Sequence, residues 1–86
     1  MKYASVNQNH PNAMRLQSVG IVLGTPSSEI KKGDFLMWNF GSVYSVNEII
    51  AETAKTITIK TSPKDKPEEI YTQKLFKNRL VCILKN

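Results

Sequence analysis

Short apolar runs separated by polar turns recur through the second half of the chain and predict β-strands. The clearest run is residues 56–60, TITIK, in which apolar and polar residues alternate. Ile57 and Ile59 are therefore expected to face a core, while the residues between them face water. Four further runs have the length and composition of strands, at residues 35–40, 43–51, 70–76 and 80–84.

The segments between these runs have the composition of turns. Gly41-Ser42 predicts a hairpin turn, since glycine readily adopts the positive φ that such turns need. Ile49 and Ile50 are consecutive apolar residues, which predicts a bulge near residues 47–48 or burial on both faces. Residues 24–28 and 62–69 are predicted to be loops, because proline, serine and charged residues dominate them.

The strand at 35–40 is apolar on both faces, and the N-terminal segment is expected to wrap it. For residues 14–23 two interpretations stay open: a strand through 16–23, which its β-branched residues favour, or a short helix ended by Gly20. Residues 1–13 are polar and are predicted to form a flexible arm. Residues 14–86 are then one domain, predicted to be all-β: a small, closed barrel of five to six strands.

The segment KKGDFLMWNFGSVYSVNEI carries a family resemblance. Gly33-Asp34 opens a strand, and Gly41 precedes a second strand that carries Val46 and Ile49. This arrangement resembles the KOW and Tudor-type subset of SH3-like barrels over about residues 30–85. The resemblance implies an SH3-like barrel that recruits proteins or nucleic acids. The short chain is also similar to small proteins of bacteriophages and mobile elements.

Composition narrows the class of protein. A chain of 86 residues has room for one domain, and no apolar run approaches the roughly 18 residues that a membrane span needs. The start lacks the apolar region of a secretory signal. Cys82 is the only cysteine and lies in an apolar run, which predicts a buried thiol and a reducing, cytoplasmic setting.

No catalytic or cofactor motif is present in the sequence. It lacks phosphate-binding glycine motifs, HExxH and CxxC, and His10 lies alone in the predicted arm. The seven acidic residues form no pair suited to acid–base chemistry, and Asp34 is expected to cap its own turn. We therefore expect no enzyme activity, no cofactor and no bound metal.

Two kinds of partner remain. The apolar strand favours a protein-interaction or assembly role, either with another protein or by self-association, through Trp38, Phe40 and Tyr44. Nucleic-acid binding is the alternative: the net charge is +5, and no acidic residue follows residue 69. Trp38, Tyr44 and Tyr71 would then stack on bases, although Trp38 is expected to be core. The residues proposed for this binding, basic apart from one tyrosine, are Lys60, Tyr71, Lys74, Lys77, Arg79 and Lys85.

Overall fold

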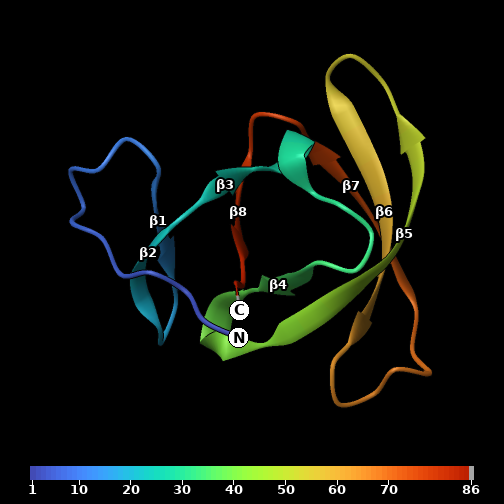
Figure 1. Cartoon of the computed structure of the whole chain (residues 1–86), viewed down its shortest axis with the longest axis horizontal. Helices are drawn as coiled ribbons and strands as arrows, with labels where there is room; N and C mark the ends of the chain where they lie inside the picture. Colours follow the sequence, from blue (N-terminus) through green and yellow to red (C-terminus); the bar gives the residue numbers. More distant parts are fainter. Residues whose placement is uncertain (86) are drawn as a thin grey trace.

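The computed structural model describes residues 1–85, which form eight antiparallel strands in two sheets (Figure 1). In chain order the elements are β1 (Ala13–Leu16), β2 (Gly20–Leu23), β3 (Thr25–Pro26), the 3-10 turn η1 (Ser27–Glu29), β4 (Phe35–Met37), the 3-10 turn η2 (Asn39–Gly41), β5 (Val43–Glu52), β6 (Thr56–Pro63), β7 (Tyr71–Phe76) and β8 (Leu80–Ile83). The larger sheet has the order β3-β8-β4-β5-β6-β7, and β1 and β2 pair separately. The prediction of an all-β fold is confirmed.

The prediction of a closed barrel is wrong, because β3 and β7 are the two edges of the larger sheet and do not pair within residues 1–85. β3 has only two residues, and Pro26 has no amide hydrogen to donate to a ladder. η1 follows at once, and the amides of Ser27 and Ser28 donate to the carbonyls of Arg79 and Lys77 in the β7–β8 turn. The chain thus passes the end of β7 instead of running along it. The predicted loop at residues 24–28 contains this short strand.

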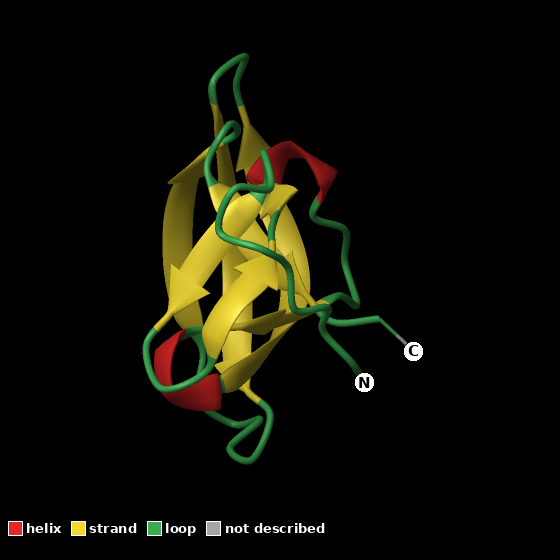
Figure 2. Cartoon of the chain, turned by 90° about the vertical axis from the view of Figure 1, so that its left-hand side faces the viewer, coloured by secondary structure: helices red, strands yellow, loops and turns green. Residues whose placement is uncertain are grey.

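Residues 14–23 form neither of the two structures predicted for them. β1 and β2 make a tight hairpin in which Met14 lies opposite Val22, and Ser18 turns the chain at φ 65°. The hairpin lies outside the larger sheet and in front of it in Figure 2. A positive φ at serine is uncommon, so the sequence did not indicate that the chain reverses at this residue, although Gly20 close by also has a positive φ of 121°.

The predicted strand at 35–40 ends three residues early. β4 stops at Met37, and η2 reverses the chain through Phe40 and Gly41, which have φ values of 65° and 75°. The positive φ expected at Gly41 is confirmed, while the one at Phe40 was not anticipated. Asp34 caps the preceding turn as predicted, since its carboxylate accepts a hydrogen bond from the Lys31 amide at 2.8 Å.

β5 and β6 form the longest hairpin, and their pairing is irregular at two places. The register shifts between Val46 and Glu48 and again between Ile49 and Ala51, so the predicted bulge near 47–48 is confirmed. The side-chain Nδ2 of Asn47 donates across to the hydroxyl of Ser62 at 2.7 Å and holds the first bulge. The turn of this hairpin and the 64–70 loop project at opposite ends of the sheet (Figure 1).

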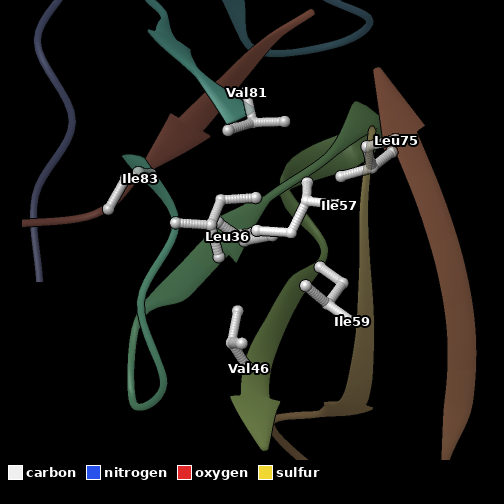
Figure 3. Close-up of a cluster of buried hydrophobic side chains, with 8 residues drawn as sticks. Leu36, Val46, Ile57, Ile59, Leu75, Val81 and Ile83 are labelled. Carbon is white, nitrogen blue, oxygen red and sulfur yellow. The ribbon is translucent and has the colours of Figure 1, made fainter. Parts of the chain in front are cut away.

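One core lies inside the curved sheet. Figure 3 shows side chains from β4 to β8 pointing into one space, and Leu36, Ile57, Ile59 and Val81 there are fully buried. The alternation predicted for β6 is confirmed, because Ile57 and Ile59 are both 0% exposed. Each fully buried aliphatic side chain contributes about 1.5–3 kcal/mol to folding.

A second cluster lies on the other side of β4 and explains why that strand is apolar on both faces. Met37 packs with Leu16 and Val22 of the β1–β2 hairpin and with Cys82 of β8. The outer face of β4 is therefore covered from the N-terminal side of the chain, but by the β1–β2 hairpin and not by the arm of residues 1–13. Cys82 is buried, 1% exposed, which confirms its predicted role as a small core residue.

The N-terminal residues run beside β2 and the end of the chain. The backbone of Lys2 exchanges hydrogen bonds with Lys85, and the amide of Leu23 donates to the carbonyl of Ala4 at 2.8 Å. Nearly all side chains of residues 1–12 are exposed, His10 among them. The two ends of the described chain lie close together in both Figure 1 and Figure 2. Flexibility of the arm stays a prediction.

Candidate functional site

A groove of about 580 Å³ lies where the β1–β2 hairpin, the end of β4 and the edge strand β7 meet. Its lining includes three aromatic side chains, two arginines and a glutamine. We call it the aromatic–arginine groove and define it by Arg15, Trp38, Tyr44, Tyr71, Gln73 and Arg79. The groove lies on the inner face of the larger sheet, next to the unpaired edge of β7.

The strand register explains why the aromatic residues meet. Val46 lies opposite Thr61 on β6, and Thr61 lies opposite Tyr71 on β7. Tyr44 is two residues from Val46, so its side chain leaves β5 on the same inner face as that of Tyr71. Trp38 lies two residues beyond buried Leu36 in extended conformation and therefore also faces inward. The inner face thus changes from an aliphatic core to an aromatic surface at the groove.

Two contacts fix the aromatic rings in the groove. The Arg79 guanidinium lies over the indole of Trp38, with its carbon 5.6 Å from the ring centroid. The rings of Tyr44 and Tyr71 meet edge to face, with centroids 6.1 Å apart and planes at 65°. Trp38 and Tyr44 are half-buried, and Trp38 packs against the main core. Part of the Trp38 ring therefore packs in the core, as predicted, while another part lines the groove.

Tyr71 lies at the open end of the groove. It is 47% exposed, and its hydroxyl donates a hydrogen bond to the carboxylate of Glu69 at 2.7 Å. This bond, with the negative charge of Glu69, raises the pKa of the Tyr71 phenol. The phenol is therefore neutral and oriented throughout the physiological range of pH.

The electrostatic character of the groove is positive. Arg15 and Arg79 are both exposed, and among the described residues that line the groove none carries a carboxylate. The indole nitrogen of Trp38 and the amide oxygen of Gln73 are buried without a hydrogen-bond partner in residues 1–85. Unpaired buried polar atoms cost about 1–3 kcal/mol each, and in native proteins they call for an explanation.

The structure divides the predicted binding residues into those inside and those outside the groove. Trp38 and Tyr44, predicted both for protein interaction and for stacking on bases, come together with Tyr71 and Arg79, predicted for nucleic-acid binding. The other predicted residues lie elsewhere: Lys60 and Lys74 on the outer face of β6 and β7, Lys77 in an ion pair with Glu52 at 3.0 Å, Lys85 beside Lys2, and Phe40 exposed on η2. The basic residues of the C-terminal end therefore do not form one surface.

Arg15 and Gln73 belong to the groove but were not predicted from the sequence. Arg15 lies in the hairpin that was interpreted as a single strand or a helix, so its neighbours could not be inferred. Gln73 faces inward opposite buried Ile59. A polar residue at an inward position of a predicted strand was the one signal that could have indicated it.

Comparisons with protein-family models, with curated proteins and with solved structures each find no match to this chain. No helix in residues 1–85 has the length and apolar character to cross a membrane. The same residues contain no group of three or more histidine, cysteine or acidic side chains placed to hold a metal ion. The composition and geometry of the groove are therefore the evidence for a binding site.

Proposed function

We propose that this protein is a non-enzymatic binding module that holds single-stranded nucleic acid in the aromatic–arginine groove. The observation that carries the proposal is the meeting of Trp38, Tyr44 and Tyr71 with Arg15 and Arg79 on one concave surface. The sequence alone favoured a protein partner, and the composition of the groove is the reason for the change of preference. The resemblance to SH3-like barrels stays a prediction.

The chemistry of the groove suits unpaired nucleotides. Bases stack on aromatic rings and on arginine planes without regard to sequence, and each stacked base contributes about 1–3 kcal/mol. Arginines beside the rings can pair with the phosphates between the bases. The groove does not need to be wide enough for a duplex, because a single strand can place its bases one by one on the rings.

The tyrosine at the open end of the groove provides the first test. Tyr71 and Phe76 are exposed aromatic residues of the same strand, but Tyr71 faces the groove and Phe76 the outer side of β7. In a fluorescence anisotropy titration with a labelled single-stranded oligonucleotide, Tyr71→Ala should weaken binding about tenfold, which corresponds to about 1.4 kcal/mol. Phe76→Ala is the matched control and should bind like the wild type. Equal affinities for all three proteins would refute the proposed site.

The arginines provide the second test through the dependence of binding on salt. Two phosphate contacts give a slope of about −1.4 for log K against log salt on a single strand, since each contact contributes about −0.7. Arg79→Ala should reduce the slope to about −0.7. Lys74→Ala removes the same charge from an exposed position outside the groove and should leave the slope unchanged. An identical slope for Arg79→Ala would contradict the role of Arg79.

A protein-interaction or assembly role is the second candidate, and the edge strand β7 supports it. No strand of residues 1–85 pairs with the outer edge of β7, and Ile70 and Phe76 beside it are 62% and 66% exposed. An unpaired edge with apolar neighbours can add a strand from another chain. This candidate predicts the reverse of the first test: Phe76→Ala would abolish association, measured by light scattering or by partner binding, and Tyr71→Ala would have the smaller effect.

A further inference from the structure

Phe40 combines two unfavourable features that burial does not offset. Its φ and ψ are 65° and 14°, the left-handed region that residues with a side chain rarely adopt. Its large apolar side chain is nevertheless 66% exposed. A strained backbone is normally compensated by the surrounding packing, and an exposed ring provides little of it. The ring at Phe40 therefore does not stabilise its own turn by packing, and its exposure at this position calls for an explanation.

The turn that holds Phe40 is fixed to the β1–β2 hairpin by two hydrogen bonds. The amide of Phe40 donates to the carbonyl of Gln17 at 2.7 Å, and the side-chain oxygen of Asn39 accepts from the amide of Gln17 at 2.8 Å. The carbonyl of Ser42 accepts from the amide of Trp38 at 2.8 Å and closes the turn. These bonds hold the backbone rigidly and keep the ring directed away from the core.

Phe40 lies at the rim of the aromatic–arginine groove. Asn39 before it and Ser42 shortly after it both line the groove. Gly41 and Ser42 also line a second hollow, which contains both Lys64 and Asp65. Phe40 thus belongs to a turn that borders both the groove and this hollow, and the hollow has one basic and one acidic side chain. Tyr44 lines both and connects them.

We propose that Phe40 is a ligand-contacting anchor, held out by its strained turn, on which a base stacks as the strand passes from the groove toward Lys64. This inference rests on the proposed function and extends it, because it gives the strand a direction and adds a fourth aromatic contact. Sequence-tolerant stacking needs an exposed ring that does not collapse onto the core. The turn provides such a ring at the expense of backbone strain.

The test separates strain from stacking by substitution at two positions that share the same φ. Ser18 also has φ 65° and lies in the adjacent β1–β2 turn, which makes it the matched control. At most positions alanine is more stabilising than glycine, but at a positive φ the order reverses. The glycine variants at residues 40 and 18 should each melt about 5 °C above the corresponding alanine variants.

Binding should distinguish the two positions. With a labelled mixed-sequence single strand of about 12 nucleotides, Phe40→Gly and Phe40→Ala should each bind about tenfold more weakly than the wild type. Phe40→Tyr keeps the ring and should bind normally, as should both Ser18 variants. Since Phe40→Gly relieves strain, its loss of affinity would not be attributable to unfolding.

Three results would overturn the inference. If both truncations of Phe40 bind normally while Tyr71→Ala binds weakly, the groove is the site and Phe40 is not part of it. If Phe40→Gly melts below Phe40→Ala, the turn is not strained as argued. If the wild-type chain binds no oligonucleotide at low salt, the proposed function itself fails and the anchor with it.

Discussion

Gly24→Ala is expected to destabilise the protein. Gly24 connects β2 of the hairpin to β3 of the larger sheet, and there is no room for a side chain at this position. A Cβ at this position would lie 2.9 Å from the Leu80 Cβ, 3.0 Å from the Met14 sulfur and 3.2 Å from the Asn12 carbonyl oxygen. The Met14 side chain can move, but the Leu80 Cβ and the carbonyl oxygen are fixed by the backbone. Overpacking of this kind costs about 1–3 kcal/mol.

The direction of the change in stability distinguishes a crowded position from an open one. The φ of Gly24 lies outside the left-handed region, so in an open space alanine would stabilise the chain by about 0.4–1 kcal/mol. A small domain of 86 residues has a free energy of unfolding of about 4–13 kcal/mol, so the predicted loss is a large fraction of it. The melting temperature should fall by about 5–20 °C.

Urea unfolding followed by circular dichroism measures the change in free energy directly. In a double-mutant cycle, Met14→Ala removes one of the clashing atoms, so Gly24→Ala should cost less in that background. A Gly24→Ala protein as stable as the wild type, or more so, would refute the close approach of the hairpin to Leu80. The placement of Arg15 at the groove would then also lose its basis.

Three further predictions concern the core and the charged surface. Leu36→Ala, at a fully buried position of β4, should lower the free energy of unfolding by about 2–5 kcal/mol in urea titrations, and a loss below 1 kcal/mol would contradict its place in the core. Burial raises the pKa of the Cys82 thiol above its ordinary value of 9.0, so its stabilising contribution holds below pH 9 and declines as the pH rises through the folded pKa. A thiol reagent at pH 8 should accordingly label Cys82 far more slowly in the native protein than in urea, and equal rates would argue against burial. Lys77→Ala breaks a partly exposed ion pair with Glu52, so it should cost about 0.2–1 kcal/mol at low salt, less at high salt, and leave oligonucleotide affinity unchanged.

The strands with regular alternation or clear turn residues could be predicted from the sequence. β5, β7 and β8 match their predicted ranges within two residues at either end, and β6 follows its apolar pattern but continues to Pro63, so the loop predicted at 62–69 begins two residues too early. The turn at Gly41 and the bulge near Asn47 were also predicted, because glycine and consecutive isoleucines have direct geometric consequences. In these places local preference and tertiary structure agree.

The places where prediction failed share a physical cause. Ser18 and Phe40 adopt a positive φ without being glycine, so the residue types did not show that each turn begins before the glycine that follows it, Gly20 or Gly41. Tertiary hydrogen bonds between these two turns, such as that from Phe40 to Gln17, hold the conformations that local preference disfavours. Barrel closure was expected because open edges are unfavourable, but Pro26 and η1 end the first edge strand after two residues.

Four of the six residues that define the groove, Trp38, Tyr44, Tyr71 and Arg79, stand together in the nucleic-acid hypothesis drawn from the sequence, but that hypothesis also included lysines that lie outside the groove. The residues inside the groove could not be separated from those outside it, because the register between β5, β6 and β7 cannot be read from the residue types. The two bulges in β5 set that register. Arg15 reaches the same surface only because residues 13–23 form a hairpin.

The fluorescence of Trp38 tests the central claim most directly, because it is the only tryptophan of the chain and its ring lies in the groove. Wild-type protein should be titrated with a single-stranded oligonucleotide at 50 mM and at 200 mM salt while the tryptophan emission is followed. Binding in the groove predicts saturable quenching of the Trp38 emission, with an affinity about sevenfold lower at the higher salt for two phosphate contacts. Unchanged emission at 50 mM salt, or quenching with the same affinity at both concentrations, would contradict binding of nucleic acid in this groove.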